Sequence, residues 1–343
     1  MALSLDDYAN PLLVNLTVPF GSFDGVSIAD DDSAFAVLTT DTSDHEKAMA
    51  ELWQAWPTPN TPAVKVTLDL PASTSTVIFG KALVAESGDV VYVLVRFCAL
   101  PSCDDKGDNA LVAAYIIGSN LTLKWRRMFA GVGLTQGFGL DESSSHGLLI
   151  FTGGTLSLLS ANDGSTVWTQ PNVDGATSNS AVVFAGTSDE FIVVAAADPA
   201  YFFSVLSAET GKSLNKVIAG ITYQGLGRLL VDGPSGAVYA STGYQIFRFD
   251  GAVLTWRKAV GSYALALTCS PAAGYPLIVM GSNYPTAFVS GKDGSVVARS
   301  YYNGSPQCSG GVSLGDAAFA ATCFGGPSGG QHMVFDYSIL HHT

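Results

Sequence analysis

The chain contains the stretch Leu159-Ser160-Ala161-Asn162-Asp163-Gly164-Ser165-Thr166-Val167-Trp168, in which a tight turn of Asn, Asp and Gly joins two short runs. The same pattern occurs four more times, at Ile117-Gly118-Ser119-Asn120-Leu121 before Trp125, Ser207-Ala208-Glu209-Thr210-Gly211, Arg248-Phe249-Asp250-Gly251 before Trp256, and Ser290-Gly291-Lys292-Asp293-Gly294. Asp-Gly pairs favour hairpin turns because Gly accepts a positive φ. The turns follow one another at intervals of about 44, 47, 40 and 43 residues, which indicates a repeated antiparallel unit.

A repeat of about 40 to 45 residues is the length of one four-stranded blade of a β-propeller. The sequence therefore predicts an all-β, seven-bladed propeller of antiparallel blades as the single domain of residues 1–343. Strands are expected in the first two blades at Ala34–Leu38, Val64–Leu68, Val90–Val95 and Leu111–Ile116. The blades are predicted at about 21–70, 71–130, 131–171, 172–217, 218–260, 261–302 and 303–343.

The last predicted blade lacks an outer strand. Its strands are expected at Ser309–Leu314, Ala317–Cys323 and Met333–Tyr337, after which only six residues remain. The segment Pro11–Val18 precedes the first blade and is similar to the outer strand at Val64–Leu68. We expect this N-terminal strand to pair in the last blade and close the ring, because closure removes an exposed sheet edge.

One segment of the first predicted blade conflicts with the repeat. Residues Asp44–Trp56 have helical propensity and a capping Asp, whereas the repeat requires a third strand there. Because the repeat recurs along the chain, we predict a strand at Glu51–Trp56 and allow a helical turn before it.

Composition suits a globular protein built of strands and turns. Hydrophobic residues make up 48% of the 343 residues, charged residues 13%, and Gly contributes 37 residues. The formal net charge of -13, with 16 Lys and Arg spread thinly, argues against a nucleic-acid partner. No apolar run is long enough to span a membrane. Because Met1–Asp7 lacks the basic and apolar regions of a signal peptide, the protein either is made without one or this numbering begins after its removal.

The turn motifs resemble the quinoprotein-like (PQQ-like) propeller repeat, whose signature is Ala, an acidic residue, Thr-Gly and then Trp. The resemblance is clear in Leu159–Trp168 and Leu206–Lys212 and weaker in the rest of the second to sixth predicted blades. It implies that the Trp of one blade docks against the next blade. The matching position holds Trp125, Trp168 or Trp256 in three blades, but Asn215 and Ala298 in two others. We therefore expect this ring of docking tryptophans, the docking belt, to be incomplete.

The enzymes of that family use features that this chain lacks. Quinoprotein dehydrogenases have eight blades, a vicinal cysteine pair and a calcium ion beside the quinone, whereas seven blades fill this length and no two cysteines are adjacent. The resemblance therefore implies a non-catalytic member without a quinone cofactor. Histidine adds no catalytic constellation, because the five residues are scattered at His45, His146, His332, His341 and His342.

Calcium is the one metal for which the sequence offers candidates. Asp104, Asp105 and Asp108, with Asn109 beside them, could hold calcium through hard oxygen ligands. Their spacing differs from that of the known calcium loop, so a solvated acidic loop is the alternative.

The cysteines predict two local disulfides. Gly315-Asp316 is expected to form a two-residue turn, and the resulting register pairs Leu314 with Ala317, Val312 with Phe319, and Cys308 with Cys323. Cys98 and Cys103 flank four residues and can close a small loop in the same way. Two bridges beside a lone Cys269 favour an oxidising compartment. The alternative is that all five cysteines are reduced core residues.

Three glycosylation sequons begin at Asn15, Asn120 and Asn303. Asn120 lies at a predicted hairpin tip and is the best acceptor. Asn303 lies in a loop, although Pro306 follows its sequon, and Asn15 lies in the closing strand and needs an outward side chain.

The two faces of the predicted ring differ in charge. The turns joining first to second and third to fourth strands share one face, which holds Asp30, Asp31, Asp32, Glu86, Asp89, Asp141, Glu142, Asp163, Asp189, Glu190, Glu209, Asp232, Asp250, Asp293 and Asp316. We expect this face to be negative and to bind cations or basic surfaces. The opposite face holds the long segments Thr39–Glu51 and Cys98–Asn109 with Tyr201, Tyr244 and Tyr284, and is expected to contact protein or glycan.

Two classes of function remain. The first is a non-catalytic scaffold or adhesion propeller, secreted or on the cell surface, which binds proteins and includes the case of a homo-polymeric assembly. The alternative uses the central funnel, as a glycan-binding propeller or a polysaccharide-active enzyme. An enzyme needs a pocket that joins His or Tyr to Arg and a carboxylate, and nothing in the sequence assembles one.

Overall fold

The computed structural model describes a chain of strands. The described residues are 12–17, 21–28, 34–40, 48–54, 62–72, 74–85, 87–99, 108–130, 139–143, 147–152, 154–171, 173, 183–187, 190–197, 201–220, 226–232, 235–242, 245–259, 266–270, 277–281, 286–300, 307–314, 318–326 and 329–336. The elements assigned within these ranges are all strands, and none of the described residues forms a helix long and apolar enough to cross a membrane. The all-β class is confirmed.

The described strands form seven antiparallel sheets of four strands each. Three of these sheets come from the first half of the chain. They are β2 (Gly21–Ile28), β3 (Ala34–Thr40), β4 (Ala48–Gln54) and β5 (Pro62–Thr67); β6 (Thr74–Val84), β7 (Val90–Ala99), β8 (Asp108–Ile116) and β9 (Thr122–Ala130); and β10 (Gly139–Ser143), β11 (Gly147–Thr152), β12 (Thr155–Leu159) and β13 (Thr166–Pro171).

Three further sheets follow along the chain. They are β14 (Val183–Thr187), β15 (Phe191–Ala197), β16 (Tyr201–Ser207) and β17 (Ser213–Gly220); β18 (Leu226–Asp232), β19 (Ala237–Thr242), β20 (Gln245–Asp250) and β21 (Val253–Ala259); and β22 (Ala266–Ser270), β23 (Leu277–Gly281), β24 (Thr286–Ser290) and β25 (Val296–Ser300). Within each sheet, strands that are consecutive in the sequence lie side by side.

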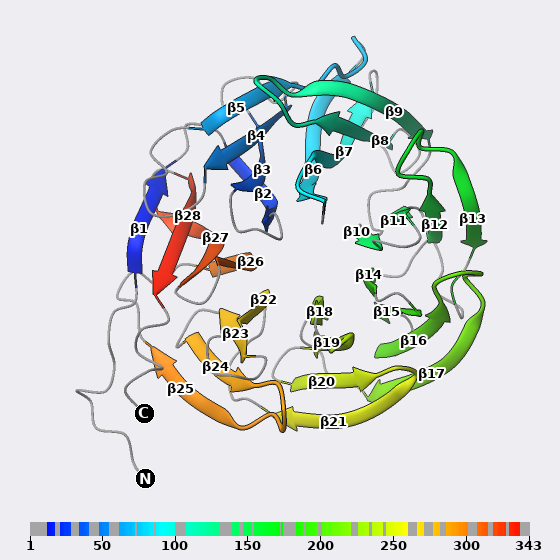
Figure 1. Cartoon of the computed structure of the whole chain (residues 1–343), viewed down its shortest axis with the longest axis vertical. Coiled ribbons are helices and arrows are strands. Elements are labelled where there is room, and N and C mark those ends of the chain that lie inside the picture. Colours follow the sequence, from blue (N-terminus) through cyan, green and yellow to red (C-terminus); the bar gives the residue numbers. More distant parts are fainter. Residues whose placement is uncertain are drawn as a thin grey trace.

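The remaining sheet combines the two ends of the described chain. It contains β26 (Gln307–Leu314), β27 (Ala318–Gly326) and β28 (Gly329–Asp336), and β1 (Leu12–Thr17) pairs antiparallel with β28. Figure 1 shows β1, in blue, beside β28, in red. The unpaired edge of β28 is therefore covered by an N-terminal strand.

The sheets are set around a common centre (Figure 1). Their first strands contact one another in the order β2, β6, β10, β14, β18, β22 and β26, and β26 in turn contacts β2. The strand at the opposite edge of each sheet, which is β1 in the sheet of β26–β28, lies farthest from the centre. We call β1, β5, β9, β13, β17, β21 and β25 the outer strands.

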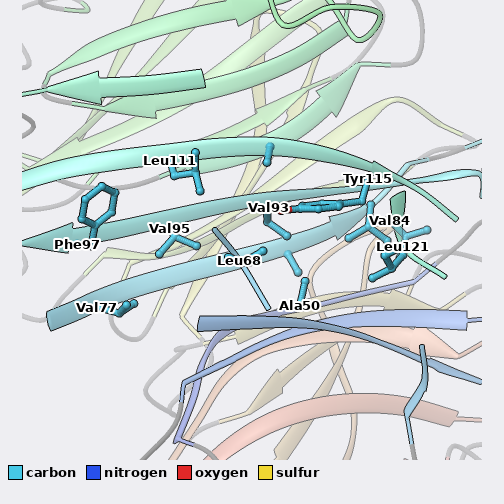
Figure 2. Packing of buried hydrophobic residues seen from close by; sticks show 13 residues of the cluster. Ala50, Leu68, Val77, Val84, Val93, Val95, Phe97, Leu111, Tyr115 and Leu121 are labelled. Carbon is cyan, nitrogen blue, oxygen red and sulfur yellow. The ribbon is translucent and has the colours of Figure 1, made fainter. Parts of the chain in front are cut away.

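Neighbouring sheets bury apolar side chains between them. Along β11, Leu148 and Ile150 pack towards the sheet β6–β9, whereas Leu149 and Phe151 pack towards β14–β17. All six residues of β11 are buried, because a strand with a neighbouring sheet on each face cannot show the usual alternation with polar residues. Figure 2 shows the equivalent cluster between β2–β5 and β6–β9, which includes Val93.

The conflicting segment of the first sheet is a strand. β4 extends from Ala48 to Gln54, so the helical turn that we allowed before Glu51 is not formed at Ala48–Ala50. β4 is paired on both sides, with β3 and with β5. These two ladders satisfy the backbone of the segment and override its helical propensity.

The predicted two-residue turn between β26 and β27 is wrong. Leu314 pairs with Ala318 rather than Ala317, and Val312 pairs with Ala320 rather than Phe319. A register shift between Ser309 and Gly311 then removes the offset of one residue, so Cys308 lies opposite Cys323 as predicted. The longer connection and the shift compensate for each other.

Candidate functional site

The turn at Ser160–Ser165 between β12 and β13 has a defined hydrogen-bond pattern. The amide of Ser160 donates to the carbonyl of Ser165 at 2.8 Å, and the amide of Gly164 donates to the carbonyl of Ser160 at 2.9 Å. Gly164 has a φ of 70°, in the left-handed region that favours glycine. The turns 207–212 and 290–295 repeat both bonds, so the sequence motif specifies one turn geometry.

Two aspartates of these turns bind their own backbone. Oδ1 of Asp163 accepts hydrogen bonds from the amide and the hydroxyl of Ser165, at 3.0 and 2.8 Å, and Asp293 does the same with Ser295. The bond from the Ser165 amide is the main reason why the pKa of Asp163 lies below its ordinary value. The prediction that these Asp-Gly pairs serve turn formation is confirmed.

Two tryptophans on outer strands dock onto the turn of the next sheet. Nε1–H of Trp125 donates to the carbonyl of Ala161 at 3.0 Å, and Nε1–H of Trp168 donates to that of Ala208 at 3.1 Å. The indole of Trp125 also covers Gly164, where an added Cβ would lie 2.7 Å from Cε3 of the ring. This glycine is therefore required both by its φ and by the close approach of the tryptophan.

Asn215 occupies the docking position of β17. Its Nδ2 donates to the carbonyl of Ala252 in the next sheet at 2.8 Å. The asparagine thus also donates to a turn carbonyl of the next sheet, but it has no ring to cover the turn. In agreement with the predicted gap in the belt of tryptophans, a Cβ added at Gly251 would meet nothing within 4 Å. The side chain of Ala298 lies outside the described residues.

Trp256 docks without the hydrogen bond. A Cβ added at Gly294 would lie 3.0 Å from Cζ3 of its ring, so the stacking on the turn is kept. Its Nε1 is buried and has no hydrogen-bond partner among the described residues. The carbonyl of Gly291 instead accepts from Nη1 of Arg248 at 2.6 Å and from the hydroxyl of Tyr239 at 3.2 Å.

An ion pair holds Arg248 in this position. Nη2 of Arg248 lies 2.8 Å from Oδ1 of Asp250, and Nε of Arg248 donates to both carboxylate oxygens. Burial raises the pKa of Asp250, but the hydrogen bonds from Arg248 and from the hydroxyl of Thr255 outweigh it and lower the pKa below its ordinary value.

A second tyrosine lies at the junction of Trp125. The rings of Tyr92 and Trp125 are 6.1 Å apart between centroids, the same separation as for Tyr239 and Trp256. Tyr92 is fully buried, and burial first, then the carboxylates of Glu142 and Asp89, raise its pKa. Its hydroxyl is hydrogen-bonded to Glu142 of the neighbouring sheet.

Each outer strand has a register shift beside the docking position. In β13 the pairing passes from Thr166 directly to Trp168, which leaves Val167 without a partner. A β-bulge of this kind changes the direction in which the next side chain points. The residues left unpaired beside the docking position of the seven outer strands are Leu13, Ala63, Lys124, Val167, Leu214, Thr255 and Val297. The alternation of apolar residues does not reveal this feature.

The predicted disulfide residues are partly described. Cys98 is disulfide-bonded. Cys103 lies outside the described residues, so the pairing of the two stays a prediction. Cys308 and Cys323 are register partners, as stated above, and their bridge also stays a prediction.

The glycosylation and calcium candidates are scattered over the fold. Asn120 is exposed in the turn between β8 and β9, and Asn15 lies in β1 opposite Met333. Asp108 begins β8 opposite Cys98. Among the described residues, no three His, Cys, Asp or Glu side chains are grouped so that they could hold a metal ion. The candidates Asn303, Asp104 and Asp105 lie outside the described residues.

Comparison with known proteins shows the fold alone. No protein-family model matches the chain, and no curated protein matches it. The crystal structure of BamB from Moraxella catarrhalis aligns with a TM-score of 0.56 at 14% identity, over 96% of this chain and 97% of that chain. Chaetomium thermophilum Raptor aligns with a TM-score of 0.67 at 12% identity, over 96% of this chain but only 29% of that chain. These likenesses support a β-propeller-like fold.

Proposed function

We propose that the chain is a closed seven-bladed propeller with PQQ-like repeats. The contacts of the first strands, which return from β26 to β2, support a closed ring. The outer strand β1 supports it independently, because its unpaired Leu13 corresponds to the unpaired residues of the other six outer strands. The docking of Trp125 and Trp168 on the next turn supports the repeat type.

We further propose that this propeller is a non-catalytic scaffold, secreted or on the cell surface, which binds other proteins. The observation that carries this proposal is the apolar surface of the outer strands. Seven large apolar side chains there are 39 to 69% exposed, namely Leu123, Met128, Val167, Leu214, Ile218, Val253 and Val296. Contiguous exposed apolar patches mark interaction surfaces, and the recurrence of these side chains on neighbouring outer strands supports such a surface here.

The described carboxylates with lowered pKa values favour a structural role over catalysis. Asp163 and Asp293 bind the backbone of their own turns, and Asp250 holds Arg248 in the contact between two sheets. The bonded Cys98 and the exposed sequon at Asn120 favour an oxidising, extracellular compartment. Intact-mass measurement with and without reductant tests this point, and five free thiols would contradict it.

Cross-linking in the native setting tests the scaffold. The protein is treated with a lysine-reactive cross-linker where it occurs naturally, and the linked peptides are identified by mass spectrometry. We expect Lys124 and Lys216, which lie exposed on outer strands, to be linked to another polypeptide chain. Lys292, exposed in a turn, serves as the control for general reactivity. Links confined to single copies, with no cross-linked species larger than one copy of the chain, would contradict the proposal.

A further inference from the structure

The outer strands carry charge of one sign. They contain half of the chain's 16 Lys and Arg residues and none of its 29 Asp and Glu residues. The cations are Lys65, Lys124, Arg126, Arg127, Lys216, Arg257, Lys258 and Arg299. We call this set, with the exposed apolar residues between them, the basic rim.

Edge protection explains only part of the basic rim. Charged side chains on an edge strand, and Lys especially, prevent unwanted strand pairing. Half of these eight cations are Arg, however, and no acidic residue stands among them although the net charge of the chain is -13. The selection of cations therefore needs another cause.

Contacts within the chain account for some of these cations. Arg126 forms an ion pair with Asp69, and Nη1 of Arg127 donates to the carbonyl of Gly164 at 3.0 Å. Lys65, Lys124 and Arg257 are exposed, as are the apolar residues Leu123 and Val253 near them. A surface of this composition fits an acidic protein surface that also offers apolar contact.

The hairpin turns of the same molecule form such an acidic surface. The amide of Ala208 donates to the carbonyl of Glu190 at 3.1 Å, and that of Ile117 donates to the carbonyl of Asp89 at 2.8 Å. These bonds join the turns after first and third strands, so both kinds of turn lie at the same end of the sheets. The exposed acids there are Asp89, Asp163, Glu190, Glu209 and Asp293. We call this surface the acidic turn face.

We propose that the basic rim of one copy of this chain binds the acidic turn face of a second copy. The inference rests on the scaffold function proposed above and names its partner. The contact joins two different surfaces, and each copy carries both, so it builds a ring or an open filament and not a two-fold dimer. Until a ring closes, every added copy again exposes one free rim and one free turn face.

Sedimentation of the purified full chain tests this proposal. Assembly is expected at low salt and dissociation at higher salt, because the Debye length falls from about 30 Å at 0.01 M to about 8 Å at 0.15 M. The rim variant Lys124→Glu/Arg257→Glu should weaken self-association by about ten-fold or more. The control Lys212→Glu/Lys292→Glu makes the same change in net charge, but these residues lie in turns of the acidic turn face, which becomes more acidic, so the control should not weaken self-association. Unfolding midpoints of all variants are measured to confirm folding.

A charge exchange identifies the two surfaces. The face variant Glu190→Lys/Glu209→Lys should also fail to assemble alone. An equimolar mixture of the rim variant and the face variant should assemble again, because each rim then meets a face of opposite charge. If the contact joined two rims instead, the face variant alone would assemble as the wild type does, because its rim is unchanged.

Three results would overturn the proposal: a wild-type monomer at every salt concentration, equal weakening by the control, or a mixture that stays monomeric. A wild-type monomer that binds heparin would assign the rim to an acidic polymer instead. None of these results removes the scaffold function if native cross-links reach a different polypeptide, so the two proposals can fail separately.

Discussion

Two junctions between neighbouring sheets satisfy the equivalent turn carbonyl with different hydrogen-bond donors. Between β6–β9 and β10–β13, Trp125 gives its indole N–H to the carbonyl of Ala161. Between β18–β21 and β22–β25, Trp256 keeps the ring contact with the turn, but Arg248 gives the hydrogen bond to Gly291. The turn carbonyl is thus satisfied at both junctions, and the donor differs.

One residue beside each tryptophan accounts for the difference. Trp125 is the register partner of Ala114, whereas Trp256 is the register partner of Arg248. Alanine leaves the indole as the donor nearest the turn. Arginine is long enough to reach the turn itself, and it leaves the indole N–H of Trp256 buried without a partner among the described residues. The comparison shows that the acceptor is the fixed part of the docking and the donor the variable part.

Truncation of the two tryptophans should have the largest effect. Trp125→Ala is expected to lower the free energy of unfolding by about 3–5 kcal/mol, because it removes a buried ring as well as a hydrogen bond. Trp256→Ala should cost about 1 kcal/mol less, because no hydrogen bond is lost. Urea denaturation of both variants measures the difference. Equal losses would mean that the hydrogen bond to Ala161 adds nothing.

Replacement of a turn glycine by alanine should lower the free energy of unfolding more where a tryptophan ring covers the glycine. Gly164→Ala and Gly251→Ala both place a side chain at positive φ, which costs about 1–2 kcal/mol. At Gly164 the new methyl group also meets the ring of Trp125, so this variant should lose about 1–3 kcal/mol more. Gly251→Ala is the matched control for backbone strain. The same denaturation experiment compares them, and equal losses would exclude an energetic role for the ring contact.

Replacement by phenylalanine isolates the hydrogen bond. Trp125→Phe keeps an aromatic ring but leaves the carbonyl of Ala161 without its donor, which should cost about 1–3 kcal/mol. Trp256→Phe removes an N–H that has no partner among the described residues, so it should cost clearly less than the change at Trp125. The unfolding free energies decide this, and a larger loss at Trp256 would contradict the assignment of Arg248 as the donor.

The two junctions should weaken at opposite ends of the pH range. Burial raises the pKa of Tyr92 above the ordinary value of 10.0. The contribution of Tyr92 to the free energy of unfolding is therefore complete below pH 10.0. Above that pH the free energy of unfolding falls by about 1.4 kcal/mol per pH unit more than in Tyr92→Phe. The pKa of Asp250 is lowered from 3.8, so its contribution is present above that pH and is lost as pH falls through the lower value. Unfolding free energies of Tyr92→Phe and Asp250→Asn across both ranges test this. Parallel profiles for the wild type and both variants would contradict it.

Local signals in the sequence were enough to predict several strands and the chemistry of the Asp163-Gly164 turn. Asp163-Gly164 specifies its turn through the φ of one residue and the hydrogen bonds of another, and neither depends on distant parts of the chain. The strand at Ala34–Leu38 followed from its apolar run and was found within β3.

Contacts between sheets were harder to predict. Asn215 was predicted to lack the ring contact, and Gly251 is indeed uncovered. Its hydrogen bond to Ala252 was not predicted, because only the fold brings these two residues of neighbouring sheets together. The donor role of Arg248 likewise depends on Gly291, 43 residues further along the chain. The unpaired residue of each outer strand depends on the register with the neighbouring strand, which apolar periodicity does not specify.

The pairing of β1 with β28 has a consequence for biosynthesis. Asn15 lies opposite Met333, so these partners are separated by nearly the whole described chain. Pairing at such a separation is slow, because the entropy of closing the loop is lost before the contacts form. During translation β1 is made before β28, so it stays without this partner until nearly all of the described chain has been made. The other six sheets can form from adjacent strands as they emerge. The sheet that contains β1 should therefore be the last to acquire protection from hydrogen exchange.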